Sequence, residues 1–337
     1  MYLISPDKKQ YKANLHCHST FSDGKKTPEE LKEMYKRNGY SILSITDHET
    51  PKNHSYLNDD EFITITGYEA YIRNNAECRH DRYGKEIHIN LFAKCPENET
   101  IICYNPKYCK YITDEQKEKY NKAGSQRTRE YSISYINEFI KTAKENGYIP
   151  VYNHPWWSME DEADILSYDG FLSMEMCNYD AYLLSRLEYN GALYDKMLKR
   201  GKKIFCHSAD DNHNVYPEGS RLCDSFGGFT MIMPKDFSYN SIIEAMEEGE
   251  MYSSMGPLFK EVSIEGNKIH IECSEVDKIT VFTGSKAPKC KYADEGATIT
   301  QADFEIDESA EYFRVSIVDK YGKFADTRGF FRDELEF

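Results

Sequence analysis

The chain has 337 residues, with 42 Lys and Arg against 57 Asp and Glu, and its formal net charge is −15. A chain of this length can bury a large core without disulfides, and its negative charge opposes binding to the phosphate backbone of nucleic acids. No apolar run reaches the ~18 residues that a membrane span needs, and the N-terminus lacks the pattern of a secretory signal. The ten cysteines are scattered singly. We therefore expect a cytoplasmic protein with reduced thiols, and neither a nucleic-acid polymer nor a membrane as a partner.

Short apolar runs with polar or histidine-bearing ends recur through the first three quarters of the chain, and helical segments follow several of them. Strands are predicted around seven such runs: Ala13–Leu15, Ser41–Ile45, Phe62–Ile65, Ile87–Phe92, Tyr148–Val151, Gly170–Met174 and Lys203–Phe205. A helix begins after Thr27, because Thr27-Pro28-Glu29-Glu30 has the pattern of a capping box with Pro at the first helical position, and Gly39 can end it. Further helices are expected over Arg127–Asn146, Ala181–Arg200 and Tyr239–Glu248.

Alternation of strands and helices is typical of a parallel sheet. With about seven strands, a closed barrel is favoured over an open sheet, and the absence of a Gly-rich loop after the first strand argues against a dinucleotide-binding fold. We therefore predict an α/β fold, a distorted (β/α)7 TIM-like barrel, over residues 1–256. Residues 94–126 fit neither pattern and are predicted to be an insertion. This insertion is either a substrate-facing lid or a solvated excursion.

The pattern of apolar and polar residues changes after Met255-Gly256-Pro257. Helical periodicity disappears, and short strand-like runs separated by turn residues predict a small all-β sandwich over residues 257–337. His270 is the only histidine of this part, so we expect no chemistry of its own there.

The histidines carry most of the functional information. Seven of the ten lie at or just after the ends of predicted strands: His16, His18, His48, His88, His154, His207 and His213. In β/α barrels the catalytic groups come from this end of the strands. His16 and His18 are one residue apart, which on a strand places both imidazoles on one face and suits a divalent transition metal. Cys17 should face the other way, as a buried small side chain.

Several acidic residues are candidates with an alternative structural explanation. Asp23 is a turn aspartate when taken alone. Asp47, in Thr46-Asp47-His48, either orients His48 or caps the following turn. Glu69 is expected at the end of the third strand, where a buried carboxylate is costly unless it is paired or bound to metal. His88, inside an apolar strand, has the alternative of a satisfied core histidine.

The last candidates follow the later strands. His154 precedes Pro155 and two tryptophans, of which Trp157 is a candidate for stacking on a substrate. The run from His207 to His213 offers two aspartates, Asp210 and Asp211, as a metal ligand. His207 itself is either a substrate contact or an ordinary buried histidine. Arg221 is a candidate phosphate clamp, with a surface arginine as the alternative.

Taken together and in this order, these residues resemble the PHP family, the polymerase-and-histidinol-phosphatase domains. The resemblance covers roughly residues 10–256, and residues 249–257 followed by a β domain resemble the two-domain branch of carbaryl-hydrolase-like metallohydrolases. The resemblance implies two or three divalent ions, Zn, Mn or Fe, held by nine side chains. These are His16, His18, Asp23, His48, Glu69, His88, His154, Asp211 and His213.

The resemblance also implies how the ligands are shared. One ion would be held by His16, His18, Glu69 and Asp211; a second by Glu69, His88 and His154; and a third by Asp23, His48 and His213. Glu69 would bridge the first two ions, and Glu69, Asp211, His48 and His213 are the predicted catalytic set.

Such a site favours hydrolysis by water that the ions activate. We predict a metal-dependent phosphoesterase that acts on a small anionic phosphate mono- or diester. Two alternatives stay open at this point. One is hydrolysis of an amide, carbamate or ester at the same cluster, and the other is a non-catalytic binding module.

Overall fold

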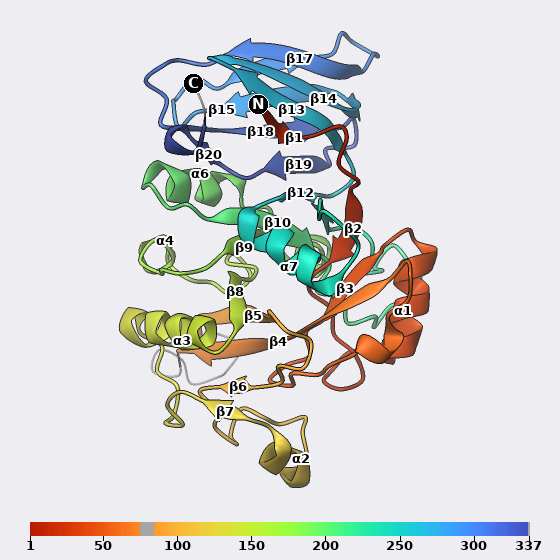
Figure 1. Cartoon of the computed structure of the whole chain (residues 1–337), viewed down its shortest axis with the longest axis vertical. Helices are drawn as coiled ribbons and strands as arrows, with labels where there is room; N and C mark the ends of the chain where they lie inside the picture. Colours follow the sequence, from red (N-terminus) through yellow and green to blue (C-terminus); the bar gives the residue numbers. More distant parts are fainter. Residues whose placement is uncertain (75–83, 336–337) are drawn as a thin grey trace.

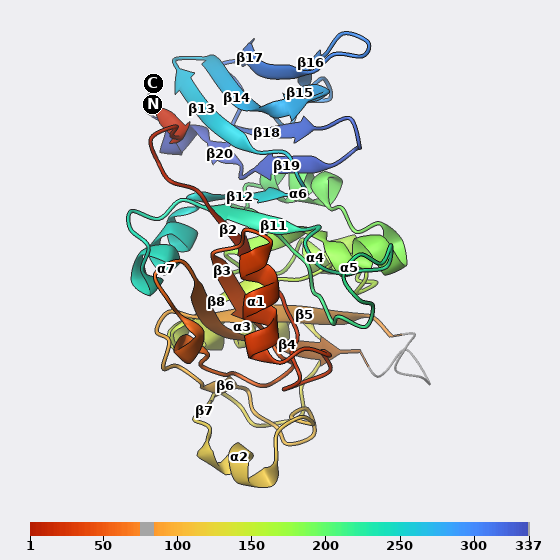
Figure 2. The same cartoon turned by 90° about the vertical axis from the view of Figure 1, so that its right-hand side faces the viewer.

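The structure is a computed structural model that describes residues 1–74 and 84–335. Three parts follow one another along its longest axis (Figure 1). The C-terminal strands lie at one end, a large sheet with its helices lies in the middle, and the segment 94–126 lies at the other end. Figure 2 shows the same order from the side.

The middle part is built on one strongly curved sheet whose strands lie close to the predicted runs. Along the chain they are β2 (Tyr11–Asn14), β3 (Ile42–Ile45), β4 (Ile63–Arg73), β5 (Glu86–Ala93), β8 (Tyr148–Tyr152), β9 (Ser173–Asn178), β10 (Phe205–Ala209), β11 (Phe229–Ile232) and β12 (Met251–Ser254). In space the order is β10-β9-β8-β5-β4-β3-β2-β11-β12. The sequence analysis missed β11 and β12 and placed the end of β4 eight residues too early, at Ile65 instead of Arg73.

The prediction of a parallel sheet is only partly right. The pairs β2–β3, β3–β4, β8–β9 and β9–β10 are parallel. By contrast, β5 is antiparallel to both β4 and β8, and β11 is antiparallel to both β2 and β12. The first residues of β5 therefore lie at the same edge of the sheet as the C-terminal end of β3.

The predicted closed barrel is not confirmed. The described strands form one sheet that curls until β10 approaches β2 and β11, and no continuous ladder joins these edges. Isolated contacts join them instead. Cys17 forms a bridge with Asn212, the Asp211 amide donates to the His16 carbonyl at 2.9 Å, and Thr230 Oγ1 donates to the Ser208 carbonyl at 2.9 Å.

The helices cover the outside of the curved sheet: α1 (Pro28–Arg37), α3 (Ile133–Glu145), α4 (Glu162–Ile165), α5 (Tyr179–Ala181), α6 (Gly191–Lys199) and α7 (Tyr239–Glu248). The predicted capping box of α1 is present, since Thr27 accepts from the Glu30 amide and the Glu30 side chain accepts from the Thr27 amide. The helix predicted over Ala181–Arg200 is wrong as one element. A π-helical turn over Tyr182–Arg186 ends at Leu187 with φ +55°, and this left-handed residue separates α5 from α6.

The segment 94–126 folds over its own small core. It contains β6 (Ile101–Ile102), α2 (Asp114–Lys119) and β7 (Lys122–Ala123), and β6 pairs with β7 in parallel. Ile101, Tyr104, Cys109 and Ile112 pack together as a cluster separate from the main core.

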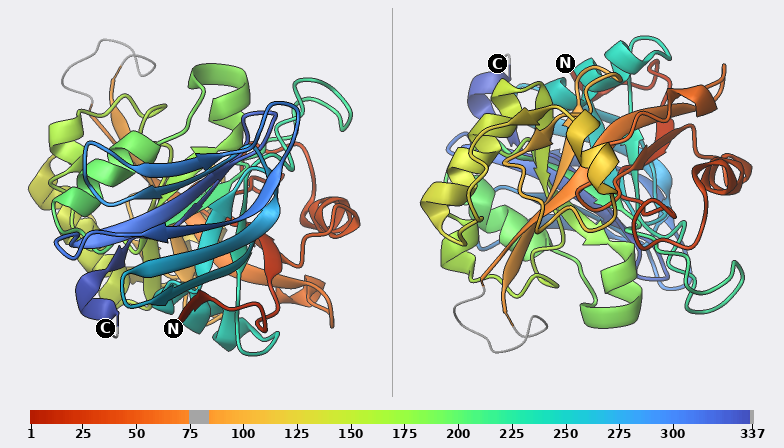
Figure 3. Two further views of the ribbon diagram at one scale, coloured as in Figure 1. Left: turned by 90° about the horizontal axis from the view of Figure 1, so that it is seen from above. Right: turned by 90° about the horizontal axis from the view of Figure 1, so that it is seen from below.

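The C-terminal part is made of β-strands, as predicted. They are β13 (Phe259–Glu265), β14 (Lys268–Val276), β15 (Lys278–Phe282), β16 (Lys289–Tyr292), β17 (Ile299–Glu305), β18 (Tyr312–Val318), β19 (Phe324–Thr327) and β20 (Phe330–Phe331). They form two layers that lie one above the other in Figure 1, and the left view of Figure 3 looks down on the outer layer. One layer is β1-β13-β14-β17, in which the N-terminal strand β1 (Tyr2–Ile4) takes part, and the other extends the main sheet through β12–β19. The division at residue 256 stays a prediction.

Two further expectations concern the whole chain. The nine cysteines among the described residues are all free, and six of them are buried; Cys78 lies outside the described residues. Within residues 1–74 and 84–335 no helix is long and apolar enough to span a membrane.

Candidate metal centre

Five of the nine predicted ligands come from the first strands of the curved sheet. His16 and His18 follow the end of β2, and His48 follows the end of β3. Glu69 lies in the middle of the eleven-residue strand β4, so the prediction that it ends its strand is wrong. His88 is the third residue of β5 and reaches the same edge because β5 runs antiparallel.

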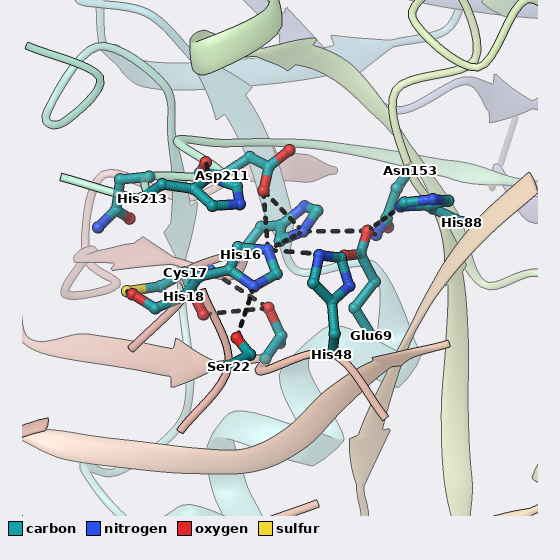
Figure 4. A network of polar contacts seen from close by, with 12 residues as sticks. His16, Cys17, His18, Ser22, His48, Glu69, His88, Asn153, Asp211 and His213 are labelled. Atoms are coloured by element: carbon teal, nitrogen blue, oxygen red, sulfur yellow. Dashed lines mark hydrogen bonds and ion pairs between the residues drawn. The ribbon is translucent and has the colours of Figure 1, made fainter. Parts of the chain in front are cut away.

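The side chains predicted for the first ion converge (Figure 4). His16 Nε2 lies 3.3 Å from His18 Nε2 and 3.2 Å from Glu69 Oε1. Asp211 Oδ1 lies 3.1 Å from His16 Nε2 and 2.9 Å from His18 Nε2. His16 and His18 are fully buried, and Cys17 between them is buried as predicted. The expectation that both imidazoles share one face is therefore confirmed.

The side chains predicted for the second ion meet at Glu69 Oε1, the oxygen that also lies near His16 Nε2. His88 Nδ1 lies 2.9 Å and His154 Nε2 lies 3.3 Å from Glu69 Oε1. Asn153, next to His154, donates from Nδ2 to the same oxygen at 2.8 Å. The Glu69 carboxylate is thus in contact with both groups.

The third group is more open. Asp23 Oδ1 lies 3.5 Å from His213 Nε2, and Asp23 Oδ2 lies 3.6 Å from His48 Nε2. His48 Nδ1 approaches Glu69 Oε2 at 2.9 Å, which connects this group to the first two. The potential ligand atoms lie within 4.8 Å of one another in three overlapping sets of residues. These sets are His18, Asp23, His48 and His213; His16, His18 and Glu69; and His48, Glu69 and His88.

The donor atoms fit a metal ion better than they fit each other. Buried Asp211 Oδ1 and His48 Nδ1 each approach a neighbouring group at 2.9 Å, but neither contact has the geometry of a hydrogen bond. Polar groups left in this way are costly in a protein interior. Burial, with the nearby imidazoles of His213 and His48, lowers the pKa of His18 to about 4. Its ring is therefore neutral near pH 7, which is the form that binds metal. As ligands, the nine residues remain a prediction.

Glu175 is a functional candidate that the sequence analysis missed. This fully buried carboxylate accepts from His16 Nδ1 at 2.8 Å and from the His154 amide at 2.8 Å. A carboxylate behind a histidine fixes the tautomer, so His16 Nε2 keeps a lone pair directed at the cluster. The signal was a glutamate inside the apolar run Phe171-Leu172-Ser173-Met174-Glu175-Met176, where an unpartnered charge is costly.

The two aspartates next to the predicted ligands have structural partners. Asp47 accepts from the Ser19 amide at 2.8 Å and from Ser22 Oγ at 2.5 Å. It therefore orders the loop after His18 and does not orient His48. Asp210 is buried and accepts from the Gly228 amide at 2.9 Å and from Tyr35 at 2.8 Å. Asp211, with φ +55°, is the aspartate that faces the cluster.

A cavity of about 300 Å³ opens onto the cluster. Its lining includes seven of the nine predicted ligands, the predicted substrate contact Trp157, and residues that the motifs did not indicate. Those additional residues are Tyr71, Arg73, Glu86, Tyr108, Lys110, Tyr111 and Asp180. The aromatic residues of the segment 94–126 gave no motif, because their place depends on how that segment folds back.

The three predicted substrate contacts have different positions. Trp157 lines the cavity and packs edge-on against His154 with ring centroids 4.9 Å apart. His207 is fully buried beside Ser173 Oγ, at 2.9 Å from its Nδ1, and does not line the cavity. Arg221 is exposed and also lies outside the cavity lining.

Solved structures with a similar course of the chain are remote in sequence. A two-domain protein from Bacteroides vulgatus, described as containing a predicted PHP-like metal-dependent phosphoesterase, is 14% identical with a TM-score of 0.45, over 94% of this chain and 92% of that chain. A putative metal-dependent phosphoesterase from Bifidobacterium adolescentis is 18% identical with a TM-score of 0.38, over 65% and 94%. An amidohydrolase from Chromobacterium violaceum is 15% identical with a TM-score of 0.38, over 60% and 87%.

A comparison with curated proteins gave no match. In a comparison with family models, residues 14–149 match the model described as the PHP domain. The matched stretch contains six of the nine converging residues, from His16 to His88. Residues 14–149 are thus similar to the PHP domain, and the resemblance that the motifs indicate is confirmed over this part of the chain.

Proposed function

We propose that the protein is a metal-dependent hydrolase, and within that class a phosphoesterase that cleaves small phosphate mono- or diesters. The proposal rests on one observation above all. Imidazoles and carboxylates from seven separate places in the chain converge on Glu69 and Asp211, with buried atoms that have no partner except one another among the described residues.

The same nine side chains are the proposed ligands. One ion would be held by His16, His18, Glu69 and Asp211. A second would be held by Glu69, His88 and His154, and a third by Asp23, His48 and His213. Divalent ions bound there would supply Lewis acidity and would make water a nucleophile near neutral pH. Zn, Mn and Fe all suit mixed imidazole and carboxylate ligands.

Neighbouring side chains hold two of the proposed histidine ligands in a fixed orientation. Glu175 holds the His16 ring through Nδ1, and Ser158 Oγ lies 3.2 Å from His154 Nδ1. Both imidazoles thereby present Nε2 to the cluster. Hydrogen-bond partners of metal-binding histidines usually fix the orientation of the imidazole ring toward the ion.

The charge of the cavity favours a phosphate over a neutral substrate. The described lining contains five carboxylates, Asp23, Glu69, Glu86, Asp180 and Asp211, and two cationic side chains, Arg73 and Lys110. Two divalent ions would reverse this negative balance, so that an anionic phosphoryl group would be attracted. The small cavity volume favours a small molecule over a polymer.

The proposal is tested with protein that is loaded in turn with Zn, Mn or Fe. The substrates are an aryl phosphate monoester, an aryl phosphate diester, an aryl acetate and an aryl carbamate. We expect metal-dependent release of the aryl alcohol from the phosphates. Turnover of the acetate or carbamate alone would refute the phosphoesterase and leave the carbonyl hydrolase as the function.

Two ligand variants and one control complete this test. His16→Ala and Glu69→Gln should lose bound metal and lower the turnover number by about a hundredfold or more, because they remove groups that act at the reacting centre. His270→Ala, which changes a half-exposed histidine on β14, should keep both. Active wild-type protein without transition metal in elemental analysis would contradict the whole scheme.

A further inference from the structure

The segment 94–126 reaches back to the metal cavity. Tyr108, Lys110 and Tyr111 line the same cavity as Asp23, His48 and Glu69. Tyr108 is buried at 7% exposure, and the neighbouring Cys109 and Ile112 belong to the small core of the segment. This stretch is therefore a packed wall of the cavity.

A buried ion pair ties this wall to the cluster. The Arg129 guanidinium donates to both oxygens of Glu49, with Nη2–Oε2 at 2.8 Å, and both side chains are at most 1% exposed. Glu49 directly follows His48. The Arg129 guanidinium also lies 4.6 Å from the centre of the Tyr108 ring. The backbone amide of Arg129 donates to Tyr108 Oη at 3.0 Å.

Aromatic rings flank the mouth of the cavity. Tyr111 lies nearly parallel to the His48 ring, with centroids 6.3 Å apart and 19° between planes, and it remains 44% exposed. Trp157 belongs to the loop after β8, and its amide donates to the buried Glu188 at 2.7 Å, which fixes its place. Both rings offer exposed surface beside a small cavity, as planar ligands require.

The cationic groups of the lining differ in what they can offer. Arg73 donates to Glu86 and is engaged in that pair. Lys110 is exposed, and its ammonium has no ion pair with any residue in the part of the chain that the structure describes. A lysine in this position can take up the charge of an anion at the cluster.

We propose that the wall formed by Tyr108, Lys110 and Tyr111 selects the substrate, and that the preferred class is a phosphate ester with one small aromatic ring as its leaving group. Tyr111 and Trp157 contact the ring, and Lys110 pairs with the anionic phosphoryl group. This deepens the proposed phosphoesterase and rests on it for the reaction, although the preference is a property of binding.

Binding can be measured without turnover by using phosphonates, whose C–P bond is not hydrolysed. Metal-loaded wild-type protein is titrated with phenylphosphonate and with methylphosphonate in a calorimeter. We expect tighter binding of phenylphosphonate by about tenfold, since stacking on aromatic side chains adds to the burial of the ring. Equal affinities would overturn the proposal.

The variants separate the two contacts. Tyr111→Ala should reduce the phenyl-to-methyl preference about fivefold, whereas Tyr111→Phe should keep it, because the ring remains. Lys110→Ala should weaken both phosphonates by a similar factor of about five to ten, and Lys107→Ala, an exposed lysine of the same segment outside the cavity lining, should change neither. An unchanged preference in Tyr111→Ala, or equal effects of the two lysine variants, would refute the assignment.

Failure of this inference can be told apart from failure of the proposed phosphoesterase function. Circular dichroism and metal content show whether Tyr111→Ala is folded and loaded, and Tyr111→Leu replaces it if it is not. A phenyl preference without hydrolysis of any phosphate ester would refute the proposed function and leave this inference intact. Hydrolysis without a phenyl preference would refute this inference alone.

Discussion

Glu160 is a carboxylate that three tyrosine hydroxyl groups surround. Tyr131 donates to Oε1 at 2.8 Å, Tyr168 to the same oxygen at 2.5 Å, and Tyr152 to Oε2 at 2.5 Å. These bonds connect the loop that contains His154 and Trp157 to β8 and to the chain just before α3. Burial raises the pKa of Glu160 from 4.5 to about 7, although the hydrogen bonds from the tyrosines oppose this shift.

This shift predicts a pH dependence of stability at the scale of one residue. The folded state holds a proton on Glu160 more tightly than the unfolded state, so the free energy of unfolding should fall as the pH rises from about 4.5 to about 7 and should level off above that. One pKa unit corresponds to about 1.4 kcal/mol. Urea unfolding of the wild type and of Glu160→Gln at several pH values measures it. The stability of the wild type relative to Glu160→Gln should fall as the pH rises, because only the wild type titrates, and a constant difference would contradict the prediction.

At the scale of elements, the Glu49–Arg129 pair holds the end of β3 against the segment that leads from β7 to α3. Glu49 has φ +52°, so the chain turns sharply after His48 and directs the Glu49 side chain away from the cluster. Its carboxylate also accepts from the Tyr71 amide at 3.1 Å. The ion pair thus contacts strand β4 at Tyr71, and Arg129 contacts the segment 94–126 at Ile102 and Tyr108.

Removal of one partner should be costly, because the other charge stays buried without compensation. Arg129→Met is expected to lower the free energy of unfolding by about 3–5 kcal/mol. Arg127→Met is the matched control, since Arg127 forms an exposed pair with Glu138 at 3.4 Å and should change stability by less than about 1 kcal/mol. The double variant Glu49→Gln/Arg129→Met should recover part of the loss. Equal effects of Arg127→Met and Arg129→Met in urea unfolding would argue against this anchor.

At the scale of the whole molecule, metal binding should stabilise the fold. The predicted ligands lie on β4 and β5 and in the loops after β2, β3, β8 and β10, so ions would tie together distant strands of the curved sheet. A ligand at a thousand times its dissociation constant stabilises a protein by about 4 kcal/mol. We therefore expect dialysis against a chelator to lower the Tm by about 5–15 °C and added metal to restore it.

Calorimetry of metal-loaded and stripped protein measures this change. The Glu69→Gln variant serves as the control, because its Tm should respond little to the chelator. A Tm that stays the same after the metal has been removed would contradict the proposed role of the ions in joining distant strands of the sheet.

The sequence by itself determined the elements whose signals are local. The capping box at Thr27 set the start of α1, Tyr239–Glu248 was predicted with the observed bounds of α7, and apolar runs located most strands. The nine candidate ligands could also be named, because short motifs in a fixed order indicated the family. These features depend on residues close together in the chain, where backbone sterics and side-chain capping act directly.

Only the tertiary structure decided the features that depend on pairing between distant residues. The antiparallel course of β5 places His88 at the cluster from the start of a strand, and β1 pairs with β13 across more than 250 residues. Glu175 gains its role through His16, and Tyr111 reaches the cavity because the segment 94–126 folds back onto Arg129. A short window of sequence contains only one partner of such a contact, so the energy of the contact cannot be estimated until the chain has folded.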